Sequence, residues 1–319
     1  MNPKKIKINS AQSSQRTDKF LAGFYVKKSR ASWQKKIKSE KVLINKKRVK
    51  PDYILKEGDE VEILSISQLP IATPYLKIGK IEIPQIEIIY EDDNVIVIDK
   101  PAGVLSQNAE SSESPSVADF LVKYLPKIRE IGQDEQRFGA VHRLDKDTSG
   151  VMVVAKNNNS FEFLKDQFKN RKTQKTYTTL VYGIISPKEG MINLKIGRSK
   201  TNPLMQTVIN TKKKEAIKSR EAVTVYKTIK TLKNYSLLEV SPKTGRMHQI
   251  RVHLKALGYP VVGDKKYFFR KYSKIEPKIN RQFLHASKLE ISLPNNTKTN
   301  FKSKLPKDLK KFLDKISMQ

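Results

Sequence analysis

Beyond residue 85, apolar residues recur in short alternating or continuous runs, which is the pattern typical of β-strands. Strand-like runs occupy residues 86–90, 94–99, 151–155, 176–182, 222–228, 234–241 and 287–292. Helical spacing occurs at residues 116–125 and 158–170. Because strands predominate and helices do not alternate regularly with them, this order predicts an α+β domain with a mixed, mainly antiparallel sheet over residues 86–319.

The first 85 residues show a different pattern. Residues 1–13 are polar and basic without periodicity, so we expect a disordered arm there. Residues 14–65 form a small separate domain in this interpretation, with a proline-bearing linker over residues 66–85. Apolar spacing within the small domain predicts two helices, from Thr17 and over Ser32–Ser39, and two short strands at Val42–Ile44 and Asp59–Ile63.

Composition narrows the class of protein. A chain of 319 residues can bury a substantial core, and the absence of cysteine excludes disulfides and thiolate metal sites. No apolar segment near the start is long enough for a signal sequence or a membrane span. We therefore expect a cytoplasmic protein that works as a monomer and has no membrane partner.

The net charge of +31 indicates a polyanionic partner. Residues 1–64 hold 17 Lys and Arg against 7 Asp and Glu, and residues 195–220 hold 8 against 1. A biased genome accounts for part of the magnitude but not for this clustering. Because no segment sets a basic face opposite a continuous apolar face, the distribution favours RNA over a membrane surface.

One loop combines an arginine, a carboxylate and turn residues between two apolar stretches. His142-Arg143-Leu144-Asp145 follows Phe138–Val141, and Thr148-Ser149-Gly150 precedes residues 151–155. Both apolar stretches are predicted as strands, so Asp145 is placed at a strand end, where a carboxylate is held rigidly without being buried unpaired. On local sequence alone, a structural role for the aspartates as turn residues stays open.

Four ordered segments resemble the RluA family of RNA pseudouridine synthases, over most of the chain from about residue 14 onwards. The loop above resembles the catalytic signature of this family. Three further segments match in order: Glu91–Gly103 (EDDNVIVIDKPAG), Lys175–Gly183 (KTYTTLVYG) and Lys243–Leu254 (KTGRMHQIRVHL). Residues 42–63 are most similar to the branch that acts on large-subunit ribosomal RNA, often called the C-type enzyme. The two basic helices and the hairpin of the small domain resemble the αL RNA-binding module.

The resemblance implies a catalytic trio. Asp145 is the catalytic carboxylate, Arg251 its cationic partner and Tyr177 an aromatic that packs on the target base and takes a sugar proton. Arg143 is implied to insert into the RNA and hold a flipped-out nucleotide, and Arg246 is a second cationic candidate for a phosphate or for Asp145. The spacing of Met247, Ile250, Leu254 and Leu257 predicts a helix around Arg251 that begins at Thr244 or Gly245.

The chemistry agrees with these residue types. Isomerising uridine means breaking a glycosidic bond, rotating the base and forming a carbon-carbon bond, and a carboxylate can attack the sugar or the base or stabilise the developing charge. An aspartate has a pKa of about 4, and a nearby arginine lowers it further, so Asp145 is ionised at neutral pH. The expected phosphate contacts of the αL module are Arg16, Lys28, Arg30, Lys35, Lys36 and Lys47.

Metal and cofactor chemistry fit the sequence poorly. His248 and His253 are five residues apart, which does not align two ligands on a helix. The glycine-containing turns match neither a dinucleotide fingerprint nor a phosphate loop. We expect no metal and no cofactor.

The sequence therefore predicts an enzyme that isomerises uridines in structured RNA, foremost large-subunit ribosomal RNA. Transfer RNA is the alternative substrate, and a non-catalytic RNA-binding ribosome-assembly factor is the alternative class. The family commonly has a histidine-containing loop after Gly103, whereas this chain has Val104–Ala109, so we expect this loop to contact RNA differently.

Overall fold

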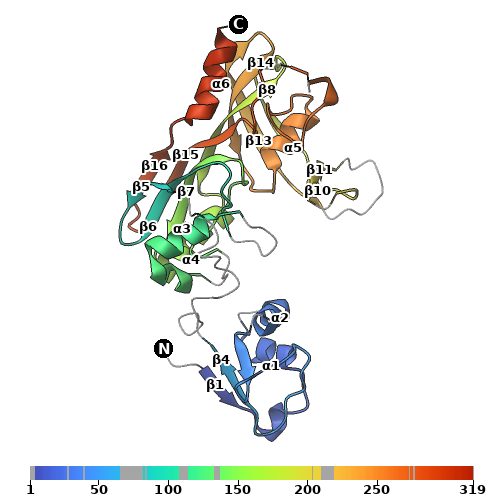
Figure 1. Cartoon of the computed structure of the whole chain (residues 1–319), viewed down its shortest axis with the longest axis vertical. Coiled ribbons are helices and arrows are strands. Elements are labelled where there is room, and N and C mark those ends of the chain that lie inside the picture. The colour runs from blue at the N-terminus through green and yellow to red at the C-terminus, as the bar shows by residue number, and fades with distance from the viewer. Residues whose placement is uncertain are drawn as a thin grey trace. The chain divides into compact units, whose positions relative to one another are not determined.

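The computed structural model divides into two compact units, residues 1–78 and 79–319, which are considered separately (Figure 1). The structure describes residues 4–26, 29–38, 40–64, 82, 85–107, 114–132, 137–202, 204–209, 219–272, 274–275 and 277–318. Nearly all of the predicted linker over residues 66–85 lies outside these residues.

The small unit is a four-stranded sheet with two helices. Its elements are β1 (Lys4–Lys7), α1 (Thr17–Phe24), α2 (Arg30–Lys38), β2 (Val42–Ile44), β3 (Lys47–Arg48) and β4 (Glu60–Ile63), with strand order β1-β4-β2-β3. Leu21, Trp33, Ile37 and Val42 are buried in its core. Both predicted helices and both predicted strands are confirmed, because their apolar stripes face this common core.

The prediction of a disordered arm over residues 1–13 is wrong for the residues that the structure describes. β1 pairs antiparallel with β4, and a 3-10 helix follows at Ser10–Gln12. Ile8 is buried and Ile6 packs against the same core, while Lys5 and Lys7 are exposed. The segment thus has the period of two of a strand, which its basic composition conceals.

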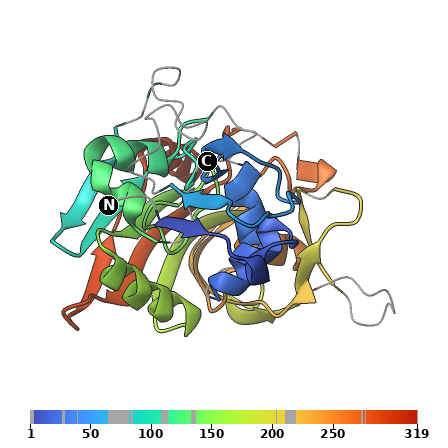
Figure 2. The same cartoon turned by 90° about the horizontal axis from the view of Figure 1, so that it is seen from below.

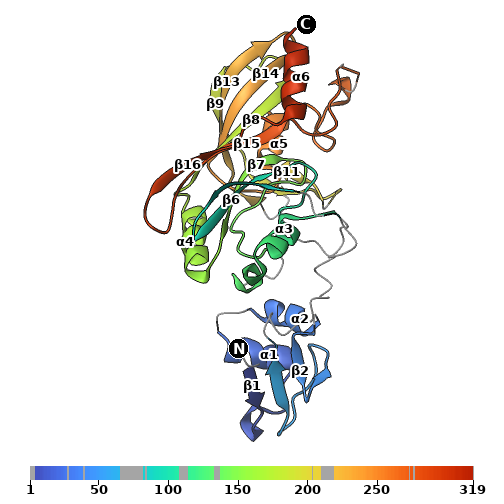
Figure 3. The same cartoon turned by 60° about the vertical axis from the view of Figure 1, so that its left-hand side comes forward.

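The large unit is built on one long sheet. Its strands are β5 (Glu87–Glu91), β6 (Val95–Lys100), β7 (Ser149–Ala155), β8 (Gln174–Tyr182), β9 (Glu189–Asn193), β13 (Val223–Leu232), β14 (Tyr235–Pro242), β15 (Leu284–Ser292) and β16 (Lys298–Lys302). The order is β5-β6-β7-β15-β8-β14-β13-β9, with β16 also pairing β15. Figure 3 shows β9, β13 and β14 at one end of this curved sheet and β6 at the other.

The pairings are antiparallel apart from β7 with β15, so the sheet is mixed and mainly antiparallel, as predicted. That one parallel pairing brings two backbones very close together. Gly150 has φ +121°, and a Cβ at this position would lie 2.2 Å from the carbonyl oxygen of Ala286. Only glycine fits there, which fixes the position where the loop that carries Asp145 enters the sheet.

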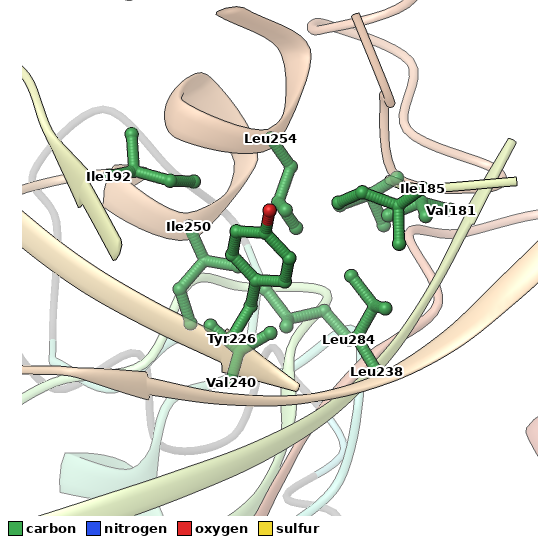
Figure 4. Close-up of a cluster of buried hydrophobic side chains, with 10 residues drawn as sticks. Val181, Ile185, Ile192, Tyr226, Leu238, Val240, Ile250, Leu254 and Leu284 are labelled. Carbon is green, nitrogen blue, oxygen red and sulfur yellow. The ribbon is translucent and has the colours of Figure 1, made fainter. Parts of the chain in front are cut away.

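Helices cover the sheet on both faces. They are α3 (Val117–Tyr124), α4 (Asn158–Lys169), α5 (Gln249–Ala256) and α6 (Lys307–Ser317). Ile250 and Leu254 of α5 pack with Val181, Leu238 and Val240 of the strands, as Figure 4 shows. The alternate strand residues, Leu180 and Leu237, pack instead with α6 residues, so α5 and α6 lie on opposite faces (Figure 1).

A second, small sheet stands at the edge of this unit. It consists of β10 (Ile196–Arg198), β11 (Gln206–Val208) and β12 (Ser219–Arg220), in the order β11-β10-β12. Figure 2 shows the β10–β11 ribbon, in yellow, away from the large sheet. Val252 of α5 and Tyr267 pack with Ile196 and Ala222 in a separate core cluster, which anchors the small sheet to the α5 face.

One predicted strand is wrong. Residues 138–141 form a turn, with only an isolated bridge from Ala140 to Val154. Phe138 and Gly139 both have positive φ, and a Cβ at Gly139 would lie 2.4 Å from the carbonyl oxygen of Ala155. The turn buries the apolar side chains of Phe138 and Ala140. Their apolar run in the sequence therefore looks like that of a strand. Asp145 consequently precedes strand β7 and does not follow a strand.

Candidate active site

The loop that carries Asp145 is held by hydrogen bonds from several elements. The buried Ser106 hydroxyl donates to the carbonyl oxygen of Leu144 at 2.7 Å and accepts from its N–H at 2.9 Å. The Lys100 ammonium donates to the carbonyl oxygen of Lys146 at 3.0 Å, and Arg281 donates to that of Asp147 at 3.2 Å. These contacts fix the backbone on both sides of Asp145.

Part of the unusual loop after Gly103 therefore has a structural role. Ser106 belongs to it and holds the residue before Asp145. Its remaining residues from Asn108 lie outside the described ranges, so a different contact with RNA stays a prediction.

The first residue of the loop is locked as well. His142 Nε2 accepts a hydrogen bond from the Val153 N–H at 3.0 Å, and its ring stacks on Phe168 with the centroids 4.5 Å apart. Burial lowers the pKa of His142 to about 3, so the ring is neutral and suited to accept that hydrogen bond. His142 is thus a positioning residue for the loop.

Asp145 and Arg251 form the ion pair that the resemblance implies. Arg251 Nη1 lies 2.9 Å from Asp145 Oδ2, with 5% of the arginine side chain and 18% of the aspartate side chain exposed. The second oxygen of Asp145 makes no hydrogen bond with any residue in the described ranges. A partly exposed carboxylate with one oxygen tied and one open is suited to react with a bound nucleotide.

Arg251 is itself fixed by a residue that the sequence did not single out. Asp264 accepts two hydrogen bonds from the guanidinium, from Nε at 2.7 Å and from Nη2 at 2.9 Å. The side chain of Asp264 is fully buried, and its Oδ1 also accepts the N–H groups of Lys266 and Tyr267, both at 2.9 Å. The fork of Arg251 therefore binds two carboxylates, one fully buried and one partly exposed.

The electrostatics keep Arg251 and Asp264 charged. Burial opposes charge on Arg251, but the ion pairs with Asp264 and then Asp145 outweigh it and raise its pKa. Burial likewise works against ionisation of Asp264, yet its bonds to Arg251 and to two backbone N–H groups lower its pKa overall. The Tyr267 ring lies 5.0 Å from the guanidinium carbon and shields the pair on one side.

His248 precedes α5 and lies near the same carboxylate. Its Nε2 is 3.9 Å from Asp145 Oδ2, and its Nδ1 is 2.8 Å from the Tyr267 hydroxyl. Burial lowers its pKa to about 4 against the smaller opposing effect of Asp145, so His248 is neutral at pH 7. Its backbone is left-handed, with φ +56°, which explains why α5 begins at Gln249 and not at Thr244 or Gly245 as predicted.

Tyr177 lies in β8 on the face that α5 covers. It packs against the core cluster that includes Ile250 of α5, in agreement with the predicted orientation of Tyr177 and Val181 on one face. Burial, and then the charge of Asp145, raise the pKa of Tyr177, so its phenol is neutral at pH 7.

The other predicted cations do not contact Asp145. Arg143 is exposed and makes no hydrogen bond or ion pair with any residue that the structure describes. Arg246 donates from Nε to the carbonyl oxygen of Glu221 at 3.0 Å, so Arg251 alone of the two supplies the partner of Asp145. Both arginines stay candidates for contact with RNA.

Two predicted cations of the small unit have an internal partner. Arg16 and Arg30 both lie 3.1 Å from the buried carboxylate of Asp18, and Gln34 donates to it at 2.6 Å. Burial opposes ionisation of Asp18, but these three partners outweigh it and lower its pKa. Since 40% of the Arg16 side chain and 50% of the Arg30 side chain remain exposed, both can still reach a phosphate.

The remaining cations of the small unit are less constrained. Lys36 lies over the Trp33 ring at 5.5 Å, and Lys47 is exposed in β3. Lys28 and the side chain of Lys35 lie outside the described parts. Contact of these residues with RNA stays a prediction.

The described residues contain neither a cluster of metal ligands nor a helix that could span a membrane. No group of three or more His, Asp or Glu side chains is arranged there to hold a metal ion. No helix there is both long and apolar enough to cross a membrane.

Comparison with known families identifies the chain. The profile described as RNA pseudouridylate synthase matches residues 94–256, half of the chain, and includes Asp145, Tyr177 and Arg251. The S4 domain profile matches residues 15–61, the two-helix module of the small unit. The chain is an RNA pseudouridine synthase of the RluA family. Members of this family isomerise uridine to pseudouridine in RNA, so the chain is an isomerase with an attached RNA-binding domain.

Individual relatives agree with this assignment. The synthase is 36% identical over 311 residues to "Ribosomal large subunit pseudouridine synthase C" of Rickettsia bellii, covering 94% of this chain and 97% of the relative. It is also 36% identical over 280 residues to "Ribosomal large subunit pseudouridine synthase D" of Borreliella burgdorferi, covering 86% and 78%. Similarity to the large-subunit branch therefore includes relatives named C and D alike.

A solved structure supports the fold of the large unit. "Human RNA Pseudouridylate Synthase Domain Containing 4" matches with a TM-score of 0.57 and 25% identity, covering 72% of this synthase and 92% of that chain. The predicted α+β class is therefore confirmed.

The sequence alone did not indicate a role in the site for four residues: Asp264, Tyr267, Lys100 and Ser106. A weak signal exists for Asp264, because it directly follows an apolar run and a glycine in Pro260-Val261-Val262-Gly263. An aspartate directly after such an apolar run is either a loop residue or buried with it. If it is buried, its carboxylate requires a partner.

Proposed function

We propose that this synthase isomerises specific uridines in large-subunit ribosomal RNA, with Asp145 as the catalytic carboxylate. The observation that carries the proposal is the 2.9 Å pair between Asp145 and an arginine whose other nitrogens are held by Asp264. The pair orients the carboxylate, while its second oxygen is open to the nucleotide. Such a preorganised charge costs no reorganisation when the glycosidic bond breaks.

The chemistry can be assigned to groups of this chain. The bond from N1 of the base to C1′ of the sugar breaks, the base turns, and C5 bonds to C1′; C5 then loses its proton and N1 gains one, so the product is an isomer of the substrate. Asp145 attacks the sugar or the base, or stabilises the positive charge that develops on the sugar, and returns unchanged. Tyr177 has a neutral phenol, and it supports the base by packing and by its hydroxyl.

Arg143 is the proposed contact that holds the target nucleotide out of its stack. It is two residues from Asp145, exposed, and without a partner in the described parts of the chain. A long cation in this state can enter the RNA at no cost in internal bonds.

Ribosomal RNA is the proposed substrate for two reasons. The names of the relatives from Rickettsia bellii and Borreliella burgdorferi refer to the large ribosomal subunit. The S4 domain and the net charge of +31 fit a large structured RNA. Action as a monomer in the reducing cytoplasm, which a chain without cysteine suits, is part of the same proposal.

Mapping of pseudouridine in total RNA, with and without the gene, tests this substrate. Sites in large-subunit ribosomal RNA that disappear with the gene and return with the purified protein are the expected result. Sites lost only from transfer RNA would instead establish the alternative substrate. No lost site, together with an inactive purified protein, would favour a ribosome-assembly factor.

Removal of residues 1–78 should weaken RNA binding and reduce its dependence on salt. Each phosphate contact that is lost lowers the slope of log affinity against log salt by about 0.7 to 0.9. Because the large unit has its own core, the truncated protein should keep much of its turnover at saturating RNA and low salt. Binding across a salt series, with steady-state isomerisation, measures both effects. An unchanged slope would argue against phosphate contacts by the S4 domain.

A further inference from the structure

Two lysines of the large unit lie in very different surroundings, Lys100 fully buried and Lys175 half-buried. The Lys100 ammonium donates to three carbonyl oxygens, those of Pro101 at 2.8 Å, Val104 at 2.7 Å and Lys146 at 3.0 Å. The ammonium of Lys175 in β8 makes no hydrogen bond or ion pair with any residue that the structure describes. Its nearest aromatic neighbour is the Phe168 ring, with the centroid 5.9 Å away. Burial lowers the pKa of Lys175.

Keeping such a cation in the folded protein is unfavourable. A charged group that leaves water needs a partner to offset its lost hydration. Lys100 has partners for all three N–H bonds, and Lys175 has none in the described residues. An anionic ligand would supply the missing partner.

The position of Lys175 indicates where such a ligand lies. Lys175 is two residues before Tyr177 and therefore on the same face of β8. Its Nζ is 3.8 Å from the point that a Cβ on Gly245 would occupy, and Phe168 beside it stacks on His142. Lys175 thus lies among the segments that carry Asp145, Tyr177 and Arg251.

Three arginines extend the positive charge from this point. Burial, followed by the neighbouring charges of Arg220 and Arg171, lowers the pKa of Arg246, which directly follows Gly245. Arg171 and Arg220 are exposed, and neither forms an ion pair with a described residue. Clustered positive charges repel one another. An anion bound among them relieves this repulsion, so its binding is favoured.

We propose that Lys175, Arg246, Arg220 and Arg171 form a binding site for consecutive backbone phosphates of the RNA next to the target uridine, with Lys175 contacting the innermost phosphate. The inference rests on the proposed function, because it takes the nucleotide beside Asp145 to be part of an RNA strand. A lysine is a compact point charge that suits a phosphate in a confined site. Arg246 is bonded to the backbone of Glu221, directly after Arg220, and with the exposed Arg220 and Arg171 it holds the next phosphates.

The test uses the full-length Lys175→Met variant, which keeps the apolar stem and removes the charge. Binding to a large-subunit ribosomal RNA transcript should weaken about tenfold or more, and the salt slope should fall by about 0.7 to 0.9. The melting temperature should stay the same or rise slightly, because a half-buried charge without a hydrogen-bond acceptor among the described residues is removed. Lys175→Arg should restore binding in part.

Lys310→Met is the matched control. It makes the same change of charge at an exposed position of α6, on the opposite face of the sheet, and should leave the slope unchanged. If Lys175→Met fails to fold, the double variant Arg171→Gln and Arg220→Gln tests the same site at exposed positions. It should lower the slope by about 1.4 to 1.8.

The results separate this proposal from the proposed function. An unchanged slope and affinity in Lys175→Met, or in the double variant, would overturn the phosphate site even if the wild-type protein isomerises the transcript. A lower melting temperature with unchanged binding would assign Lys175 a structural role and would also overturn it. If Lys175→Met binds the transcript more weakly but the wild-type protein isomerises no uridine in it, the phosphate site would be supported and the proposed substrate would be refuted.

Discussion

The Asp145→Asn variant will bind RNA about as tightly as the wild-type protein and will isomerise almost no uridine. Asparagine keeps the size of the side chain and can still accept a hydrogen bond from Arg251 Nη1, which lies 2.9 Å from Asp145 Oδ2. It lacks the negative charge that attacks or stabilises the nucleotide, so the turnover rate should fall by about 10⁴-fold or more. Single-turnover isomerisation of the ribosomal RNA transcript, with binding measured in parallel, gives both quantities.

Asp147→Asn is the matched control for that change. Asp147 belongs to the same loop. Its backbone carbonyl oxygen accepts a hydrogen bond from Arg281, and a change of side chain leaves this bond in place. Turnover of this variant should stay within a fewfold of wild type. Comparable turnover in Asp145→Asn and the wild-type protein would remove Asp145 from its proposed role.

Replacement of Arg251 by lysine should cost both activity and stability. One ammonium cannot reproduce the three bonds that the guanidinium makes, two to Asp264 and one to Asp145. Loss of a partner from a buried pair typically costs about 3 to 5 kcal/mol, and lysine recovers part of it, so we expect a loss of about 2 kcal/mol in the free energy of unfolding. Activity should fall by about a hundredfold, because the charge on Asp145 is no longer oriented.

Urea unfolding and single-turnover rates of Arg251→Lys measure the two effects. Arg198→Lys provides the control, because this exposed arginine at the end of β10 makes no side-chain bond with a residue that the structure describes and the substitution keeps the charge. Its activity should be close to wild type. Normal stability and activity in Arg251→Lys would mean that the fork between the two carboxylates is unimportant.

The large-unit sheet could be predicted from the sequence to a large extent because its strands have strong local patterns. The runs at residues 94–99 and 176–182 correspond to β6 and β8 within two residues at either end. The helix at residues 158–170 corresponds equally well to α4, whose Leu164 is buried. Each of these segments buries one face or both, so apolar spacing reports the structure directly.

The failures have a different origin. At residues 138–141 a turn buries apolar side chains, and burial alone does not distinguish a turn from a strand. The start of α5 depends on the left-handed backbone of His248, which no residue type required. In both cases the conformation is set by contacts with distant parts of the chain.

The site shows the same division. Asp145, Tyr177 and Arg251 were found through resemblance, and the pairing of Asp145 with Arg251 follows the expectation. Asp264 was missed because it lies in the irregular segment after α5, and no periodicity of the sequence links positions 251 and 264. Lys100 was missed because its partners are backbone carbonyls, which sequence does not specify.

The strand order of the large sheet constrains how the chain is made. β15 lies between β7 and β8 and so joins the half that contains β5 and β6 to the half that contains β13 and β14. During synthesis β15 emerges after all of these strands, so both halves wait with an open edge, at β7 and at β8, until residue 284 has been added. Unpaired edges invite pairing with other chains. A nascent chain interrupted after β14 would therefore lack both a closed sheet and the Ala286 backbone against which Gly150 packs, and it would be prone to aggregate before it could modify any RNA.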